Sequence, residues 1–123
     1  MVIKLMIVDD SNIIRSKITR VLSLHKMEVV ATACNGEEAV RLFAETKPDV
    51  VTMDLTMPLM DGLECIRALR KLNSKVKILV VSALSDKSTA IQALKEGAQG
   101  FLCKPFSESE LTESMEELLG EGA

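Results

Sequence analysis

Residues 3 to 10 read Ile3-Lys-Leu-Met-Ile-Val-Asp-Asp10, a short apolar run that ends in two carboxylates. Four further apolar runs follow along the chain, at residues 28–33, 50–53, 76–81 and 100–103. They are rich in β-branched residues, and most do not alternate between polar and apolar. Such runs are typical of strands that are covered on both faces in a parallel sheet. The chain is therefore predicted to contain a buried parallel sheet of five strands.

Segments with helical periodicity lie between these runs. Their apolar residues recur at spacings of three and four, which places them on one helix face: Ile14, Ile18, Val21 and Leu22; Ala39, Leu42 and Phe43; Leu63, Ile66 and Leu69; and Leu111, Met115, Leu118 and Leu119. A further helix is indicated before Gly97, which has the character of a left-handed stop. Strands and helices thus alternate five times. Because parallel strands need right-handed crossovers, we expect an open, doubly wound sheet with helices on both faces.

Three helix starts carry a capping signal. Asn35, Asp61 and Ser107 each precede a glutamate by three residues, the spacing at which a side chain satisfies the unpaired amides of the first turn. Lys47-Pro48-Asp49 is predicted to break the chain before the third strand. These signals set the expected boundaries of the elements.

The composition bounds the class of protein. With 123 residues, of which 47% are hydrophobic and 27% charged, the chain is predicted to form one domain over residues 1–123. A net charge of −3 disfavours direct binding to nucleic acid. The aromatic content is only 2%, with neither Trp nor Tyr, which disfavours stacking against bases or a flavin ring.

Cysteine usage and the amino-terminal run indicate the compartment. Cys34, Cys65 and Cys103 are odd in number and widely spaced, so they predict neither a disulfide framework nor a zinc site. The first apolar run contains Lys4 and stops at residue 9, far short of the roughly 20 residues of a membrane span. We expect a cytoplasmic protein that does not insert into a membrane.

Chemically active side chains follow four of the five predicted strands: Asp9 and Asp10, Asp54, Ser82, and Lys104. The carboxyl ends of parallel strands meet at one edge, so these side chains are expected to lie close together. Three carboxylates in one crevice repel one another unless a cation or a proton compensates. Oxygen ligands without imidazole or thiolate favour Mg²⁺.

Lys104 and Ser82 add a point charge and a hydroxyl, which suit the oxygens of a phosphoryl group. A carboxylate beside Mg²⁺ can itself be the nucleophile that accepts phosphate. Asp54 stands alone at the tip of a central strand and is the predicted acceptor. The paired Asp9 and Asp10 are predicted to hold the metal.

Four motifs, taken together, resemble the receiver family of two-component response regulators, particularly the CheY-like chemotaxis receivers. They are Ile7-Val-Asp-Asp10; Met53-Asp-Leu-Thr-Met-Pro58 with Asp61-Gly62; Val81-Ser-Ala83; and Lys104-Pro-Phe106. The resemblance extends over essentially all 123 residues. It implies the flavodoxin-like fold with strand order 2-1-3-4-5. It also implies a phosphoacceptor signalling protein that assists its own phosphorylation and dephosphorylation, rather than an enzyme.

The resemblance assigns the acceptor and the metal ligands. Asp54 would be the phosphoacceptor. Asp10, Asp54 and the backbone carbonyl of Thr56 would bind Mg²⁺, and Asp9 would hold the metal through water.

The resemblance also implies a switch and its partners. Ser82 and Lys104 would contact the phosphoryl group, with a cis peptide bond at Lys104-Pro105. Ser82 and Phe101 would then move to change the surface of the fourth helix, fifth strand and fifth helix. A histidine kinase would be the donor, and a downstream protein or output domain the target.

Two other classes of protein fit the sequence less well. Aspartyl-nucleophile phosphatases also use Mg²⁺, but they carry a second Asp two positions after the nucleophile, where this chain has Thr56. A flavodoxin-type electron carrier would share the fold, yet a Ser/Thr-rich phosphate loop after the first strand is missing here. Within the receiver family, the chain could be part of a longer regulator with a methylesterase or DNA-binding domain.

Overall fold

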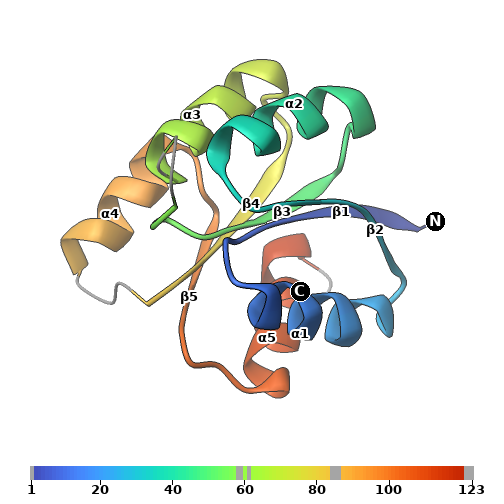
Figure 1. Cartoon of the computed structure of the whole chain (residues 1–123). Coiled ribbons are helices and arrows are strands. Elements are labelled where there is room, and N and C mark those ends of the chain that lie inside the picture. The colour runs from blue at the N-terminus through green and yellow to red at the C-terminus, as the bar shows by residue number, and fades with distance from the viewer. Residues whose placement is uncertain (1, 58–59, 61, 84–86, 121–123) are drawn as a thin grey trace.

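The computed structural model describes residues 2–57, 60, 62–83 and 87–120. Within this part of the chain, strands and helices alternate from end to end (Figure 1). The elements are β1 (Ile3–Val8), α1 (Asn12–Ser23), β2 (Met27–Ala33), α2 (Gly36–Thr46), β3 (Val50–Met53), α3 (Gly62–Leu72), β4 (Lys77–Ser82), α4 (Lys87–Glu96), β5 (Gly100–Cys103) and α5 (Glu108–Leu119). The predicted alternation of five strands with five helices is confirmed.

The five strands form one parallel sheet in the order β2-β1-β3-β4-β5. This order, which the family resemblance implied, is confirmed. Two strands differ by one residue from the expected bounds: β2 begins at Met27 and not at Glu28, and β4 spans Lys77–Ser82 and not residues 76–81. In β4, the amide of Val76 bonds Asn73 O in the preceding turn (3.3 Å), so the ladder begins at Lys77, whose amide bonds Asp49 O (3.1 Å).

The helices cover both faces of the sheet (Figure 1): α1 and α5 lie on one face, and α2, α3 and α4 on the other. Each face has its own core. Under α1 and α5 the fully buried side chains include Leu5, Ile7, Ile18, Leu22 and Leu111. Under the other helices they include Met6, Met53, Ile66, Leu69 and Ile78. Successive residues of the central strands point alternately into these two cores. Both odd and even positions of these strands are therefore apolar, as the apolar runs in the sequence predicted.

Side-chain caps begin the helices where the sequence predicted them. Asn35 accepts from the amide of Glu38 (2.8 Å), and Ser107 and Glu110 form a complete capping box before α5. A further cap, which was not predicted, is Ser11, whose hydroxyl accepts from the amide of Ile14 (3.3 Å) at the start of α1. The predicted cap Asp61, like Pro58 of the same motif, lies outside the described residues.

Three of the described helices end at residues with positive φ: α2 at Lys47, α4 at Gly97 and α5 at Gly120. Gly97, the predicted stop after α4, has a φ of +122°, which a residue without a Cβ adopts without strain. At the end of α2, Lys47 takes the left-handed conformation with a φ of 49°, directly before Pro48. The sequence predicted a break at this point but not its left-handed geometry.

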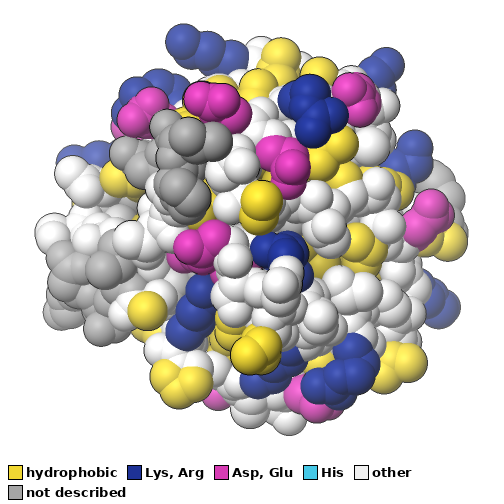
Figure 2. Space-filling view, viewed as in Figure 1, with side chains coloured by type: hydrophobic (Ala, Val, Ile, Leu, Met, Phe, Trp, Pro, Cys, Tyr) yellow, Lys and Arg dark blue, Asp and Glu magenta, His cyan; other side chains and the backbone are white. Residues whose placement is uncertain are grey.

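Charges of both signs share the surface seen from the side of Figure 1. In Figure 2 the lysine and arginine side chains of this face are interspersed with acidic ones and form no continuous basic field over the described residues. Among the same residues, no helix has the length and apolar content needed to cross a bilayer.

Candidate functional site

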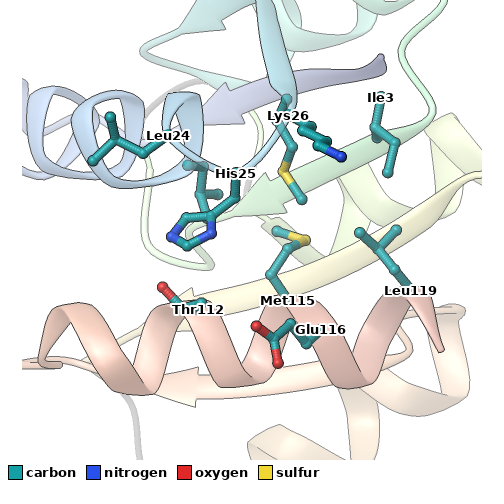
Figure 3. A pocket seen from close by; sticks show the side chains of 10 residues that line it. Ile3, Leu24, His25, Lys26, Thr112, Met115, Glu116 and Leu119 are labelled. Atoms are coloured by element: carbon teal, nitrogen blue, oxygen red, sulfur yellow. The ribbon is translucent and has the colours of Figure 1, made fainter. Parts of the chain in front are cut away.

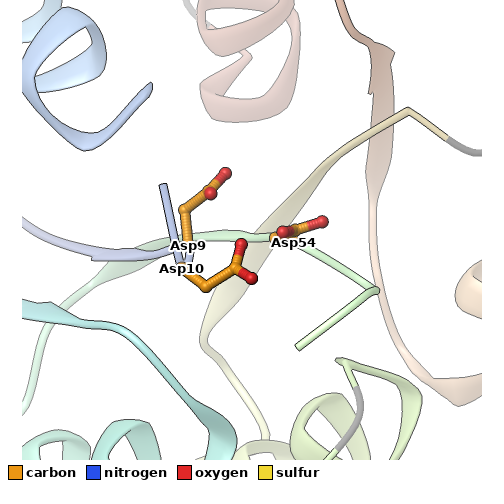
Figure 4. A group of neighbouring side chains, drawn as sticks. All are labelled: Asp9, Asp10 and Asp54. Carbon is orange, nitrogen blue, oxygen red and sulfur yellow. The ribbon is translucent and has the colours of Figure 1, made fainter. Parts of the chain in front are cut away.

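Three carboxylates meet where β1 and β3 end. Asp9 and Asp10 leave the end of β1, and Asp54 leaves the end of β3 beside them (Figure 4). One carboxylate oxygen from each residue lies within 4.8 Å of the other two. Asp9 and Asp54 are buried, whereas Asp10 is exposed. The structure therefore brings together the acidic cluster that the strand ends predicted.

The backbone of the two central strands positions this cluster. The amide of Asp54 bonds Val8 O (2.9 Å), and the amide of Asp9 bonds Ala33 O (3.0 Å), so the ladder continues beyond both strands. Val8 and Met53 are the last paired residues of β1 and β3. Asp9 and Asp54 are therefore the next residues along neighbouring strands, on the same face of the sheet.

Lys104 contributes an ammonium group to the same site. Its Nζ lies 2.8 Å from Asp9 Oδ2 and 3.6 Å from Asp54 Oδ2, and its side chain is only 18% exposed. The backbone amide of Lys104 bonds Ser82 O (2.9 Å), which fixes the end of β5 against β4. The Lys104-Pro105 peptide bond is cis, as the resemblance implied.

Burial and neighbouring charges change the acidity of Asp54. Loss of solvent, reinforced by the charge of Asp9, raises the pKa of Asp54 from 3.8 to about 6. Lys104 and the backbone amide of Thr56, which donates to Asp54 Oδ1 (3.3 Å), act in the opposite direction on this pKa. Desolvation and the neighbouring carboxylates together outweigh these two effects on the pKa, so the site favours a proton or a cation. An all-oxygen donor set of this kind fits a hard divalent ion such as Mg²⁺.

Three further predicted residues, Ser82, Thr56 and Phe101, lie on or after β3, β4 and β5. Ser82 is fully buried at the end of β4, between β3 and β5, and its register partner is Cys103. Thr56 is exposed, two residues beyond Asp54. Phe101 is half-buried against the core under α2, α3 and α4, three residues before Lys104.

Three residues near the site were not predicted from the sequence. Arg15 on α1 donates from Nη1 to the backbone carbonyl of Asp9, and Lys17 on α1 donates to the carbonyl of Phe106. Thr52 on β3 has a buried hydroxyl without a hydrogen-bond partner among the described residues. A basic residue soon after the acidic pair was the available signal for Arg15. Lys17 and Phe106 are 89 positions apart, so no local pattern reveals their contact.

A separate cavity of about 370 Å³ lies between the α1–β2 turn and the second half of α5 (Figure 3). Apolar and polar side chains both line it, the polar ones being His25, Lys26, Thr112 and Glu116. Ile3, which lines it, begins β1, whereas Asp9 follows the other end, roughly 20 Å away at strand rise. This cavity does not belong to the acidic cluster, and His25 is exposed there.

A family model for the response regulator receiver domain matches residues 5–116. The chain belongs to this receiver family. The matched stretch contains the acidic cluster together with Ser82 and Lys104. The predicted family and the flavodoxin-like fold class are confirmed.

Relatives of this receiver include stand-alone and multidomain proteins. It is 40% identical over 114 residues to the chemotaxis protein CheY of Listeria monocytogenes, which covers 93% of this chain and 96% of that one. It is also 40% identical over 119 residues to a protein-glutamate methylesterase/protein-glutamine glutaminase of Nocardioides sp., covering 94% of this chain but 32% of that one. Among solved structures, the CheX–CheY–BeF3–Mg²⁺ complex of Borrelia burgdorferi superposes with a TM-score of 0.92 at 28% identity, covering 95% and 89% of the two chains.

Proposed function

We propose that Asp54 accepts a phosphoryl group, from a phosphohistidine of a kinase or from a small donor such as acetyl phosphate. An Asp54 carboxylate oxygen attacks phosphorus, the P–N bond to the imidazole breaks, and an acyl phosphate forms. The imidazole, protonated on its other nitrogen, leaves as a neutral ring. The observation that carries this proposal is the buried Asp54 carboxylate, 3.6 Å from Lys104 Nζ and beside two further carboxylates.

The acidic cluster is the proposed Mg²⁺ site. Asp10, Asp54 and the backbone carbonyl of Thr56 would hold the ion, and Asp9 would contact it through water. When bound, Mg²⁺ neutralises charge on the phosphoryl oxygens. Support comes from the three carboxylate oxygens within 4.8 Å of one another and from the raised pKa of Asp54. The Borrelia complex contains Mg²⁺ as well.

Lys104 and Ser82 are the proposed contacts of the phosphoryl oxygens. The Lys104 ammonium already lies between Asp9 and Asp54, so it is near the position that a phosphoryl group on Asp54 would take. An ammonium and a hydroxyl both donate hydrogen bonds to phosphoryl oxygens. These residues therefore assist phosphorylation and dephosphorylation, and the protein signals rather than processing a separate substrate.

Intact mass after incubation with acetyl phosphate tests the acceptor. The wild type should gain one phosphoryl group with Mg²⁺ and none with EDTA, and Asp54→Asn should gain none. Asp49→Asn is the matched control because Asp49 is an exposed aspartate five residues earlier, and it should be labelled normally. Labelling that persists in Asp54→Asn would show that another residue is the acceptor.

We also propose that phosphorylation changes the surface of α4, β5 and α5. The Ser82 hydroxyl would move toward the phosphoryl group, and the half-buried ring of Phe101 would move into the space beside α4. One hydrogen bond to a charged oxygen contributes about 1.5 to 3 kcal/mol, which biases two states roughly ten- to hundredfold. Beryllofluoride should therefore shift the NMR signals of residues remote from Asp54, such as Ala90, Lys95, Phe101 and Glu110. Changes confined to the Asp54 pocket would contradict this switch.

Residues 1–123 are proposed to act as one receiver domain, phosphorylated by a histidine kinase and recognised by a downstream target, as in chemotaxis. The alternative is a receiver within a longer regulator, whose output domain is a methylesterase or binds DNA. The methylesterase relative favours it, because only 32% of that protein aligns with this chain. The full open reading frame distinguishes the two. We propose a cytoplasmic location, which the free thiols of Cys34, Cys65 and Cys103 favour.

A further inference from the structure

Lys17 joins α1 to the turn between β5 and α5. Its ammonium donates a hydrogen bond to the backbone carbonyl of Phe106 and lies 4.5 Å from the centre of the Phe106 ring. The Phe106 side chain is buried, at 4% exposure, so the anchor point is part of the core. A charged donor makes the stronger class of hydrogen bond, and the ring face adds attraction for the cation.

This anchor lies two residues after Lys104. On its amino-terminal side, Lys104 is held by its own amide, which bonds Ser82 O (2.9 Å). On its carboxyl-terminal side, the chain is held at Phe106 by Lys17. The segment that carries Lys104 is therefore fixed at both ends while its ammonium lies 2.8 Å from Asp9 and 3.6 Å from Asp54.

We propose that Lys17 is a positioning residue for Lys104, and that through the Phe106 carbonyl it sets how well the ammonium meets a phosphoryl group on Asp54. This inference rests on the proposed function of Asp54. Lys17 touches none of the three carboxylates, so Mg²⁺ binding should not depend on it. Contacts with phosphoryl oxygens need placement within a fraction of an ångström, and a group that orients another group typically changes affinity or rate about 10- to 100-fold when it is lost.

The chain offers a matched control for a contact of the same kind. Arg20, also on α1, pairs with Glu108 Oε2 (2.9 Å) at the start of α5. Both of these side chains are mostly exposed, at 61% and 58%, and the pair does not hold the segment between Lys104 and Phe106. Arg20→Met therefore removes a link from α1 to α5 without releasing Lys104.

A comparison of four proteins tests the positioning role of Lys17: the wild type, Lys17→Met, Lys17→Arg and Arg20→Met. We expect Lys17→Met to lower both the beryllofluoride affinity and the rate of phosphorylation by acetyl phosphate about tenfold, with Mg²⁺ affinity unchanged. Its Lys104 amide signal should move in NMR spectra recorded before any phosphoryl donor is added. Lys17→Arg keeps a charged donor and should restore most of the rate, and Arg20→Met should match the wild type. Circular dichroism confirms that each variant is folded under the assay conditions.

Equal beryllofluoride affinity and phosphorylation rate in the wild type and Lys17→Met would overturn the inference. A parallel loss of Mg²⁺ affinity without rescue by arginine would also overturn it, because that pattern indicates a general disturbance of the fold. Failure of the wild type itself to be phosphorylated on Asp54 would instead refute the proposed function.

Discussion

Replacing Asp54 by asparagine should stabilise the protein at neutral pH in the absence of Mg²⁺. The side chain of Asp54 is only 5% exposed, and it shares its site with Asp9 and Asp10. Asparagine has nearly the same shape but no charge. The substitution therefore removes an unfavourable buried charge and leaves the packing in place.

The pKa shift sets the size of this effect. The pKa of Asp54 rises from 3.8 to about 6, a difference of roughly two units, and each unit corresponds to about 1.4 kcal/mol. The largest gain in unfolding free energy that Asp54→Asn can give at pH 7 is therefore about 3 kcal/mol. The pKa shift already includes the attraction between Asp54 and Lys104, which asparagine loses. The amide NH₂ of asparagine would also lie near the Lys104 ammonium, which reduces the gain. We expect a gain in unfolding free energy of about 1 to 3 kcal/mol.

The gain should depend on pH in a defined direction. Because the pKa is higher in the folded state, the native protein binds more protons than the unfolded chain between about pH 4 and pH 6. The contribution of Asp54 to the stability of the wild type should therefore fall as the pH rises through this window and level off above it. Asp54→Asn lacks this loss, so its advantage should be near zero at pH 4 and complete at pH 7.5.

Urea unfolding followed by far-ultraviolet circular dichroism measures this difference, since the chain has neither Trp nor Tyr for fluorescence. The buffers should contain EDTA and cover pH 4 to 7.5. Glu28→Gln is the control because Glu28 is an exposed acid on β2, and it should change stability little at any pH. The reasoning is refuted if Asp54→Asn is no more stable than the wild type at pH 7.5, or if its advantage is equally large at pH 4. Saturating Mg²⁺ should reduce the advantage, because a ligand that binds the native wild type stabilises it.

Three further substitutions test the site and its support. Asp10→Asn should weaken Mg²⁺ binding about tenfold or more through loss of a charged ligand, and equal affinities in an NMR titration would contradict the metal role. Thr52→Val replaces a buried hydroxyl that has no hydrogen-bond partner among the described residues, so urea unfolding should show a gain of about 1 kcal/mol, and a loss would mean that the hydroxyl is satisfied. Gly62→Ala would place a Cβ 2.5 Å from both Asp54 O and Leu55 Cα, and should lower stability by about 2 kcal/mol; an unchanged urea midpoint would show that the backbone yields there.

Much of the site was predictable because a parallel sheet orders its strand ends. Once residues 3–8 and 50–53 were recognised as buried strands, Asp9 and Asp54 had to follow them at the same edge. Lys104 was placed by the same logic at the end of β5. The caps at Asn35 and Ser107 were equally local, since each depends on a partner three residues away.

The remaining features depend on tertiary packing. Lys17 and Phe106 meet only because α1 and α5 pack on the same face of the sheet. The two other basic residues of α1 have different partners, since Arg15 bonds the Asp9 carbonyl and Arg20 pairs with Glu108. Lys47 takes a left-handed conformation at the end of α2, where glycine is the usual residue, and its amide bonds Phe43 O (2.9 Å). The shift in the pKa of Asp54 likewise depends on burial, which a sequence pattern predicts in direction but not in size.

The Lys104 ammonium and the carboxylates it meets come from parts of the sheet that differ in local stability. Asp9 and Asp54 follow the central strands β1 and β3, whereas Lys104 follows β5, a four-residue strand at the edge of the sheet. Edge elements open at lower free energy than central ones, so hydrogen exchange should reach the β5 amides before those of β1 and β3. Opening of β5 would withdraw one positive charge from three carboxylates and leave the carboxylates in place. A phosphoryl group on Asp54, as proposed, would give Lys104 another partner, and phosphorylation would then favour the closed edge of the sheet.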